Sequence, residues 1–244
     1  MNQKKTICID AGHGGSDPGA IANGMRESDI TFEVSIILKG LLEQAGFNVI
    51  LTRTEAFINP GINGRFQFAN VNGADYFVSI HVNAGGGTGA ETFYYTGKND
   101  SAFARTVNDA YASTMGLRNR GLKHDTQTHV GSLGVLRHTT MPAILLELAF
   151  IDSPSTNPDV SLLRNARHAM AVAVCEGVCK HINVRVNVEP IALPTLNIDV
   201  LGTVKNIHGF IKDGESFVRL TEYSAALGYK AAWDEKRRIP VITK

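Results

Sequence analysis

Two histidines and two glutamates of this chain stand where side chains can carry out chemistry. His13 and His81 each follow a short apolar run typical of a buried strand, and a glycine-rich loop comes soon after each. Glu147 lies in the middle of the most apolar run of the chain, where an ionisable side chain is costly unless it is paired or functional. Glu27 follows the loop that holds His13 and stands at the start of a predicted helix.

These residue types suit a catalytic zinc site. Such a site needs three protein ligands and an open position for water, and two histidines with one carboxylate are a known ligand set. The second carboxylate would then serve as the base. Each residue alone also has a structural interpretation: Glu27 suits the first turn of a helix, and Glu147 could pair with Arg65 or Arg137. A purely structural explanation would have to apply separately to each of four residues that meet at one edge of one sheet. The pattern therefore favours a zinc hydrolase.

The elements between these residues predict an α/β fold. Residues 7–53 read as a strand, a helix capped by Ser28 or Asp29, and a second strand, a unit that gives parallel pairing. Ligands bind beyond the carboxyl ends of parallel strands, so we expect the histidines and glutamates to converge there. The sheet is therefore predicted to be mostly parallel, twisted and flanked by helices. Further predictions are a helix over 65–72, strands over 76–80, 91–96 and 143–151, helices over 101–117 and 160–182, a polar loop over 118–134 and a short strand over 133–137.

The carboxyl-terminal part of the chain differs in character. Residues 1–182 are predicted to form the domain that carries the site, and residues 183–196, with two prolines, read as an extended linker. Residues 197–244 are predicted to form a small β-rich α+β module, with a helix over 221–227.

Composition excludes several classes of protein. The net charge is +1 and the pI about 7.8, so the chain lacks the excess of positive charge that is typical of nucleic-acid-binding proteins. The longest apolar stretch, residues 143–151, is too short to cross a bilayer, so we expect no membrane insertion. No apolar segment of the length of a secretory signal follows Met1, which predicts synthesis in the cytoplasm without a signal peptide. The three cysteines are expected to be small buried side chains, and the oligomeric state is left open.

Several blocks of residues 5–182 occur in an order found in one family. They are Asp10–Ala20, Glu27, Leu51–Arg53, Arg65 with Ala69–Asn70, Ala74–Ala84 and Leu145–Ile151. These blocks resemble the zinc-dependent N-acetylmuramoyl-L-alanine amidases of the type 3 family. The resemblance implies that His13, Glu27 and His81 hold one Zn²⁺ in the catalytic domain and that Glu147 is catalytic.

The implied substrate is bacterial peptidoglycan. The bond hydrolysed would be the amide between the lactyl group of N-acetylmuramic acid and L-alanine of the stem peptide, with Glu147 taking a proton from water and passing it to the leaving amine. Two alternatives stay open, a zinc peptidase acting within the stem peptide and a non-catalytic wall-binding or regulatory protein on the same fold. A wall hydrolase made without a signal peptide suits a phage endolysin released by lysis, or mother-cell lysis in a spore former.

Substrate contacts are predicted from two places in the sequence. Arg118, Arg120 and Lys123 form a cationic segment that we expect to contact carboxylates of the stem peptide, with a solvated loop as the alternative. Asn83, close to His81, is a further candidate. The tail from residue 197 is similar to the small module first described at the amino end of copper amine oxidases, which implies cell-wall binding or dimerisation.

Overall fold

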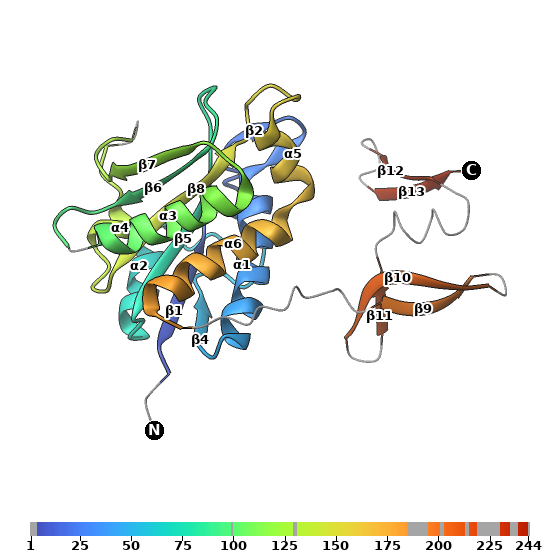
Figure 1. The fold of residues 1–244 in the computed structure, drawn as a ribbon, viewed down its shortest axis with the longest axis horizontal. Helices are drawn as coiled ribbons and strands as arrows, with labels where there is room; N and C mark the ends of the chain where they lie inside the picture. The colour runs from blue at the N-terminus through green and yellow to red at the C-terminus, as the bar shows by residue number, and fades with distance from the viewer. Residues whose placement is uncertain are drawn as a thin grey trace. The chain divides into compact units, whose positions relative to one another are not determined.

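The computed structural model describes residues 4–98, 100–128 and 131–184, together with the backbone of five strands between residues 195 and 243. Contacts between residues divide the chain into two units, Met1–Val188 and Glu189–Lys244, and each is described by itself. The elements of the first unit (Figure 1) are β1 Thr6–Ala11, β2 Ile21–Ala22, β3 Met25–Arg26, α1 Glu27–Gln44, β4 Asn48–Leu51, α2 Gly61–Val71, β5 Tyr76–Asn83, β6 Ala90–Tyr94, α3 Ser101–Met115, β7 Asn119–His124, α4 Gly134–Arg137, β8 Ala143–Phe150, α5 Pro158–Asn165 and α6 Arg167–Ile182.

The first unit is built on one sheet of six strands. Their order is β4-β1-β5-β8-β6-β7. β1 is parallel to β4 and to β5, β5 is parallel to β8, and β6 is parallel to β7. β6 and β8 pair antiparallel. The predicted α/β fold with a mostly parallel sheet is confirmed.

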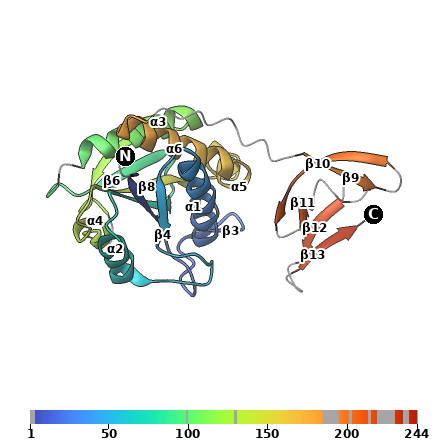
Figure 2. The same cartoon turned by 90° about the horizontal axis from the view of Figure 1, so that it is seen from below.

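Helices cover both faces of this sheet, as Figure 2 shows, with α1, α3 and α6 on one face and α2 and α4 on the other. Ile7, Cys8 and Ile9 in β1 are fully buried for this reason. A strand covered on both faces is apolar along its whole length, which explains the continuous apolar runs of the sequence. All three cysteines are buried and free. In the described part of the chain no helix has the length and apolar character needed to cross a membrane.

Two predictions for residues 118–137 are wrong. The segment expected to be a polar loop contains β7, and the segment expected to be a short strand is the helix α4. β7 lies at the edge of the sheet and, among the described strands, pairs with β6 alone. Its sequence, Asn-Arg-Gly-Leu-Lys-His, therefore lacks the apolar character of the central strands.

Two helix boundaries also differ from expectation. α1 begins at Glu27, its N-cap is Arg26, and no side chain caps it, so neither Ser28 nor Asp29 has the predicted role. The helix expected over 160–182 is two helices, α5 and α6, because the backbone of Ala166 between them leaves the helical conformation.

The described strands of the second unit form two antiparallel sheets. β9 Thr195–Val200, β10 Thr203–Lys212 and β11 Glu215–Val218 form a three-stranded sheet. β12 Lys230–Asp234 pairs with β13 Ile239–Thr243. The predicted helix over 221–227 and most of the predicted linker lie outside the described residues. A role of this unit in wall binding or dimerisation stays a prediction.

Gly177 on α6 provides a test of the helix packing. A Cβ atom added there would lie 2.9 Å from the Cα atom of Val107 on α3, so the two helices would have to move apart. We expect Gly177→Ala to lower the free energy of unfolding by about 1–3 kcal/mol, measured by urea denaturation followed by circular dichroism. Gly40→Ala on α1 is the control, because a Cβ atom there meets nothing within 4 Å. Equal stability of the two variants would contradict the close packing of α3 and α6.

Candidate metal centre and active site

The first histidine lies where the chain leaves β1. The N–H of Gly12 donates a hydrogen bond to the carbonyl of Ile80 on β5 at 3.0 Å, which ties this loop to the neighbouring strand. His13 has a φ angle of 60°, a left-handed conformation that is uncommon for a residue other than glycine. Its ring meets the ring of His81 edge to face, with the centroids 5.0 Å apart.

Two buried arginines hold the carbonyl groups of this loop. Arg65 donates from Nη1 to the carbonyl of Ala11 and from Nη2 to that of His13, both at 2.7 Å. Arg53 donates from Nε to the carbonyl of Ala11 at 3.0 Å and from Nη2 to that of Gly12 at 3.2 Å. Arg53 and Arg65 therefore fix the backbone that carries His13.

Asp10 anchors Arg65 beneath the loop. Its carboxylate is fully buried and accepts hydrogen bonds from Arg65 Nη1 at 2.7 Å, Thr52 Oγ1 at 2.6 Å and Ser79 Oγ at 2.7 Å. Burial alone would raise the pKa of Asp10, but the charge of Arg65 and the two hydroxyl groups outweigh it, so the pKa lies below its usual value. Asp10 and Arg65 are therefore both charged, and both oxygens of the Asp10 carboxylate accept hydrogen bonds.

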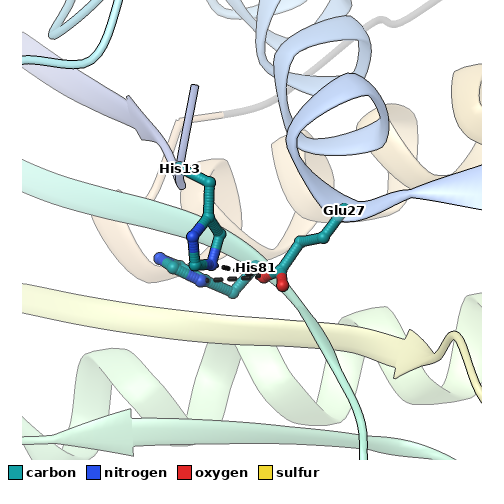
Figure 3. A group of neighbouring side chains, drawn as sticks. All are labelled: His13, Glu27 and His81. Carbon is teal, nitrogen blue, oxygen red and sulfur yellow. Dashed lines mark hydrogen bonds and ion pairs between the residues drawn. The ribbon is translucent and has the colours of Figure 1, made fainter. Parts of the chain in front are cut away.

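His13, Glu27 and His81 come together at this edge of the sheet (Figure 3). Oε1 of Glu27 lies 3.2 Å from Nε2 of His13 and 3.0 Å from Nδ1 of His81. Oε2 of Glu27 accepts a hydrogen bond from the N–H of Ala20 at 2.9 Å. The carboxylate is thus held between both rings by the first turn of α1 and by the loop before it.

Asp17 sets the orientation of the His13 ring. Its Oδ2 lies 2.9 Å from Nδ1 of His13, so a proton on Nδ1 leaves Nε2 to face Glu27. Burial lowers the pKa of His13, but the hydrogen bonds and charges of Glu27 and Asp17 outweigh it and raise the pKa. Burial raises the pKa of Glu27, but both histidines outweigh it, so the pKa lies well below its usual value. The Glu27 carboxylate and the His13 ring therefore stabilise each other's charged forms.

The donor set of this cluster fits a divalent metal ion such as Zn²⁺. One ligand atom from each of the three residues lies within 4.8 Å of the others. Tetrahedral zinc with ligands at its usual bond lengths places them about 3.3 Å apart, close to the separations between Glu27 and the two rings. An ion with two nitrogen ligands and one carboxylate oxygen therefore needs little movement of these side chains.

Glu147 lies next to this cluster on the neighbouring strand. It pairs in register with His81 on β5 and with Glu91 on β6. Its Oε2 atom is buried and, among the described residues, has no hydrogen-bond partner. Burial, and then the charges of Glu27 and Glu91, raise the pKa of Glu147 well above its usual value.

The two structural partners considered for Glu147 are occupied elsewhere. Arg65 binds Asp10, and Arg137 donates from Nε to Oδ2 of Asp125 at 2.5 Å. The interpretation of Glu147 as a paired structural carboxylate is therefore wrong. A carboxylate whose buried oxygen has no partner among the described residues, beside a cluster that could hold a metal ion, is suited to proton transfer.

A cavity of about 580 Å³ opens over the cluster. Its walls contain all four predicted site residues and three of the four predicted substrate contacts, and they also include Glu91 of β6 and Phe150 of β8. The predicted residues that line it are His13, Glu27, His81, Glu147, Asn83, Arg120 and Lys123. Arg118 is not among the residues that line it. A second cavity of about 360 Å³ lies on the side of His13 that faces Asn59 and Ile62.

Three residues of the site were missed by the sequence analysis: Asp17, Glu91 and Phe150. Glu91 had a signal of the kind that identified Glu147, since it is an acidic residue within a stretch expected to be a buried strand, and it is indeed buried. Phe150 read only as part of an apolar strand. Nothing in the sequence distinguishes its ring from those of the core.

Comparison with known proteins places residues 7–180 in the family model described as N-acetylmuramoyl-L-alanine amidase. The chain is 37% identical over 172 residues to a sporulation-specific N-acetylmuramoyl-L-alanine amidase of Bacillus subtilis, covering 68% of this chain but 63% of that protein. It is 32% identical to an endolysin of Bacillus phage SPP1, covering 74% and 67% of the two chains. A solved amidase of Clostridium difficile 630 matches 75% of this chain and 98% of its own, with a TM-score of 0.66 and 30% identity.

Gly12 leaves the space that His81 occupies. A Cβ atom added at Gly12 would lie 2.5 Å from the His81 ring. We expect Gly12→Ala to displace this ring and, if the cluster holds Zn²⁺, to lower the affinity for added Zn²⁺ by about tenfold or more, as changes around metal ligands do. Competition with a chromophoric chelator measures the affinity, and Gly40→Ala on α1 is the control. Unchanged affinity in a folded Gly12→Ala protein would contradict the close approach of Gly12 and His81.

Proposed function

The chain belongs to the N-acetylmuramoyl-L-alanine amidase family, and we propose that it hydrolyses the amide bond between the lactyl group of N-acetylmuramic acid and L-alanine of the stem peptide. The observation that carries this proposal is the position of Glu147, which pairs in register with His81 beside the cluster of three potential metal ligands. The proposed substrate is bacterial peptidoglycan, and the proposed place of action is the cell wall.

We propose that His13, Glu27 and His81 hold one Zn²⁺. His13 would bind through Nε2 and His81 through Nδ1, because these are the nitrogens that face Glu27. When bound, zinc would polarise the carbonyl of the scissile amide and lower the pKa of water at its open position. Asp17 would hold the His13 ring in the orientation that presents Nε2.

Glu147 is the proposed general base and acid. Its carboxylate would take a proton from the attacking water and pass it to the nitrogen of L-alanine as the C–N bond breaks. A raised pKa suits both transfers, because a carboxylate that accepts a proton readily at neutral pH can also hold it until the amine leaves. Its buried Oε2 atom, which has no hydrogen-bond partner among the described residues, supports this role.

Exchange of Glu147 separates proton transfer from metal binding. Glu147→Gln preserves size but cannot accept the proton, so we expect kcat to fall about 100-fold or more while zinc content, measured by elemental analysis, stays that of the wild type. His81→Ala should lose the metal instead. Glu176→Gln, at an exposed position on α6, is the control. Near-normal turnover of Glu147→Gln would contradict the assignment of Glu147.

Digestion of purified sacculi tests the reaction itself. We expect free amino termini of L-alanine to appear in mass spectra without new reducing sugars, and a chelator to abolish them. A zinc peptidase would instead create amino termini within the stem peptide and leave L-alanine attached to muramic acid. A wall-binding or regulatory protein on this fold would bind sacculi and release no product.

A further inference from the structure

Glu91 and Arg120 form a pair in the cavity wall that the proposed reaction does not use. Glu91 on β6 has a side chain that is 7% exposed, and it faces Glu147 in register on β8. Its Oε1 accepts a hydrogen bond from Nδ2 of Asn83, and its Oε2 accepts one from Nε of Arg120, both at 2.7 Å. Both oxygens of this buried carboxylate are therefore engaged in fixing neighbouring side chains.

Arg120 is held on a second side by an aromatic ring. Its guanidinium carbon lies 4.8 Å from the centroid of the Phe150 ring, within the range of a cation–π contact. The bond to Glu91 uses Nε, and within the described residues Nη1 and Nη2 make no hydrogen bond. Arg120 lines the cavity and its side chain is 27% exposed. A guanidinium fixed at Nε presents its two terminal nitrogens in the geometry that binds a carboxylate through two hydrogen bonds.

The sheet gives a measure of how far Arg120 lies from the reacting bond. β6 separates β8, which carries Glu147, from β7, which carries Arg120. Adjacent strands are about 4.8 Å apart, so about 10 Å separate the two backbones. An extended peptide covers about 3.3 Å per residue. A peptide leaving the scissile bond in this direction would bring one of its first three residues to Arg120.

We propose that Arg120, positioned by Glu91 and Phe150, binds a carboxylate borne by one of the first three residues of the stem peptide and thereby selects substrates by the charge at that residue. This inference rests on the proposed function. Glu91 acts as a positioning residue, because its carboxylate fixes Arg120 and both of its oxygens already accept hydrogen bonds from Asn83 and Arg120. Lys123 also lines the cavity, but an ammonium group is a point charge and cannot form the paired contact of a guanidinium.

The test compares soluble muramoyl tripeptides in which each carboxylate of the stem is replaced in turn by a carboxamide. For the wild-type protein, we expect amidation of one position to lower kcat/KM roughly tenfold or more, as the loss of a charge-assisted contact does. Arg120→Gln should lower kcat/KM on the free acid and leave it almost unchanged on the amide, which abolishes the preference. Arg120→Lys keeps the charge and should retain part of the preference. Arg105→Gln, at an exposed position on α3, should retain all of it.

Four outcomes would overturn the inference. The first is a wild-type protein that cleaves acid and amide forms equally. The second is Arg120→Gln with an intact preference, and the third is an equal loss on both forms, which indicates a purely structural role. Where Arg120→Gln does not fold, Arg120→Lys with the full wild-type preference overturns it. If the wild-type protein releases L-alanine amino termini from none of the substrates, the proposed function itself is contradicted. The failure of the inference and the failure of the proposed function are therefore distinguishable.

Discussion

The buried ion pair of Asp10 and Arg65 is the interaction on which the loop that carries His13 depends. A buried pair stabilises a fold only if its remaining polar atoms are satisfied, because both ions lose their hydration. Here the Asp10 carboxylate also accepts hydrogen bonds from two hydroxyl groups. Arg65 also donates hydrogen bonds to the carbonyls of Ala11 and His13. The left-handed backbone of His13 is strained for a residue with a side chain. The Asp10–Arg65 pair stabilises this strained backbone conformation. The His13 ring then faces Glu27.

The order of strands then places the other groups in a row. Parallel strands β1, β5 and β8 bring His13, His81 and Glu147 to one edge of the sheet. β6 runs in the opposite direction, so the residue that reaches this edge comes from its beginning, and that residue is Glu91. Arg120 is likewise near the start of β7, which is parallel to β6. Ends of some strands and beginnings of others therefore build one continuous site.

This topology decides how much the sequence could predict. The placement of His13, His81 and Glu147 together followed from apolar runs that end in, or contain, a polar residue, because burial on both faces makes such a residue conspicuous. β7 gave no such signal, since an edge strand is half exposed and its pairing depends on β6. Arg120 was therefore expected on a polar loop, whereas it lies on β7 and lines the cavity. The position of Glu27 at the start of α1 was predicted, but the cap expected at Ser28 or Asp29 is absent, because Glu27 is held by His13 and His81, which no local capping rule contains.

The two carboxylates that face each other across β6 and β8 acquire different roles from their surroundings. Glu91 has a cation at 2.7 Å and an amide donor, so its charge is compensated within the protein. Glu147 has neither, and its buried oxygen has no partner among the described residues. Identical side chains at paired positions thus differ in their contacts, and burial together with the charges of Glu27 and Glu91 raises the pKa of Glu147 well above its usual value. Arg120 contributes to this difference, because the hydrogen bond that compensates the charge of Glu91 also fixes its guanidinium at the cavity wall.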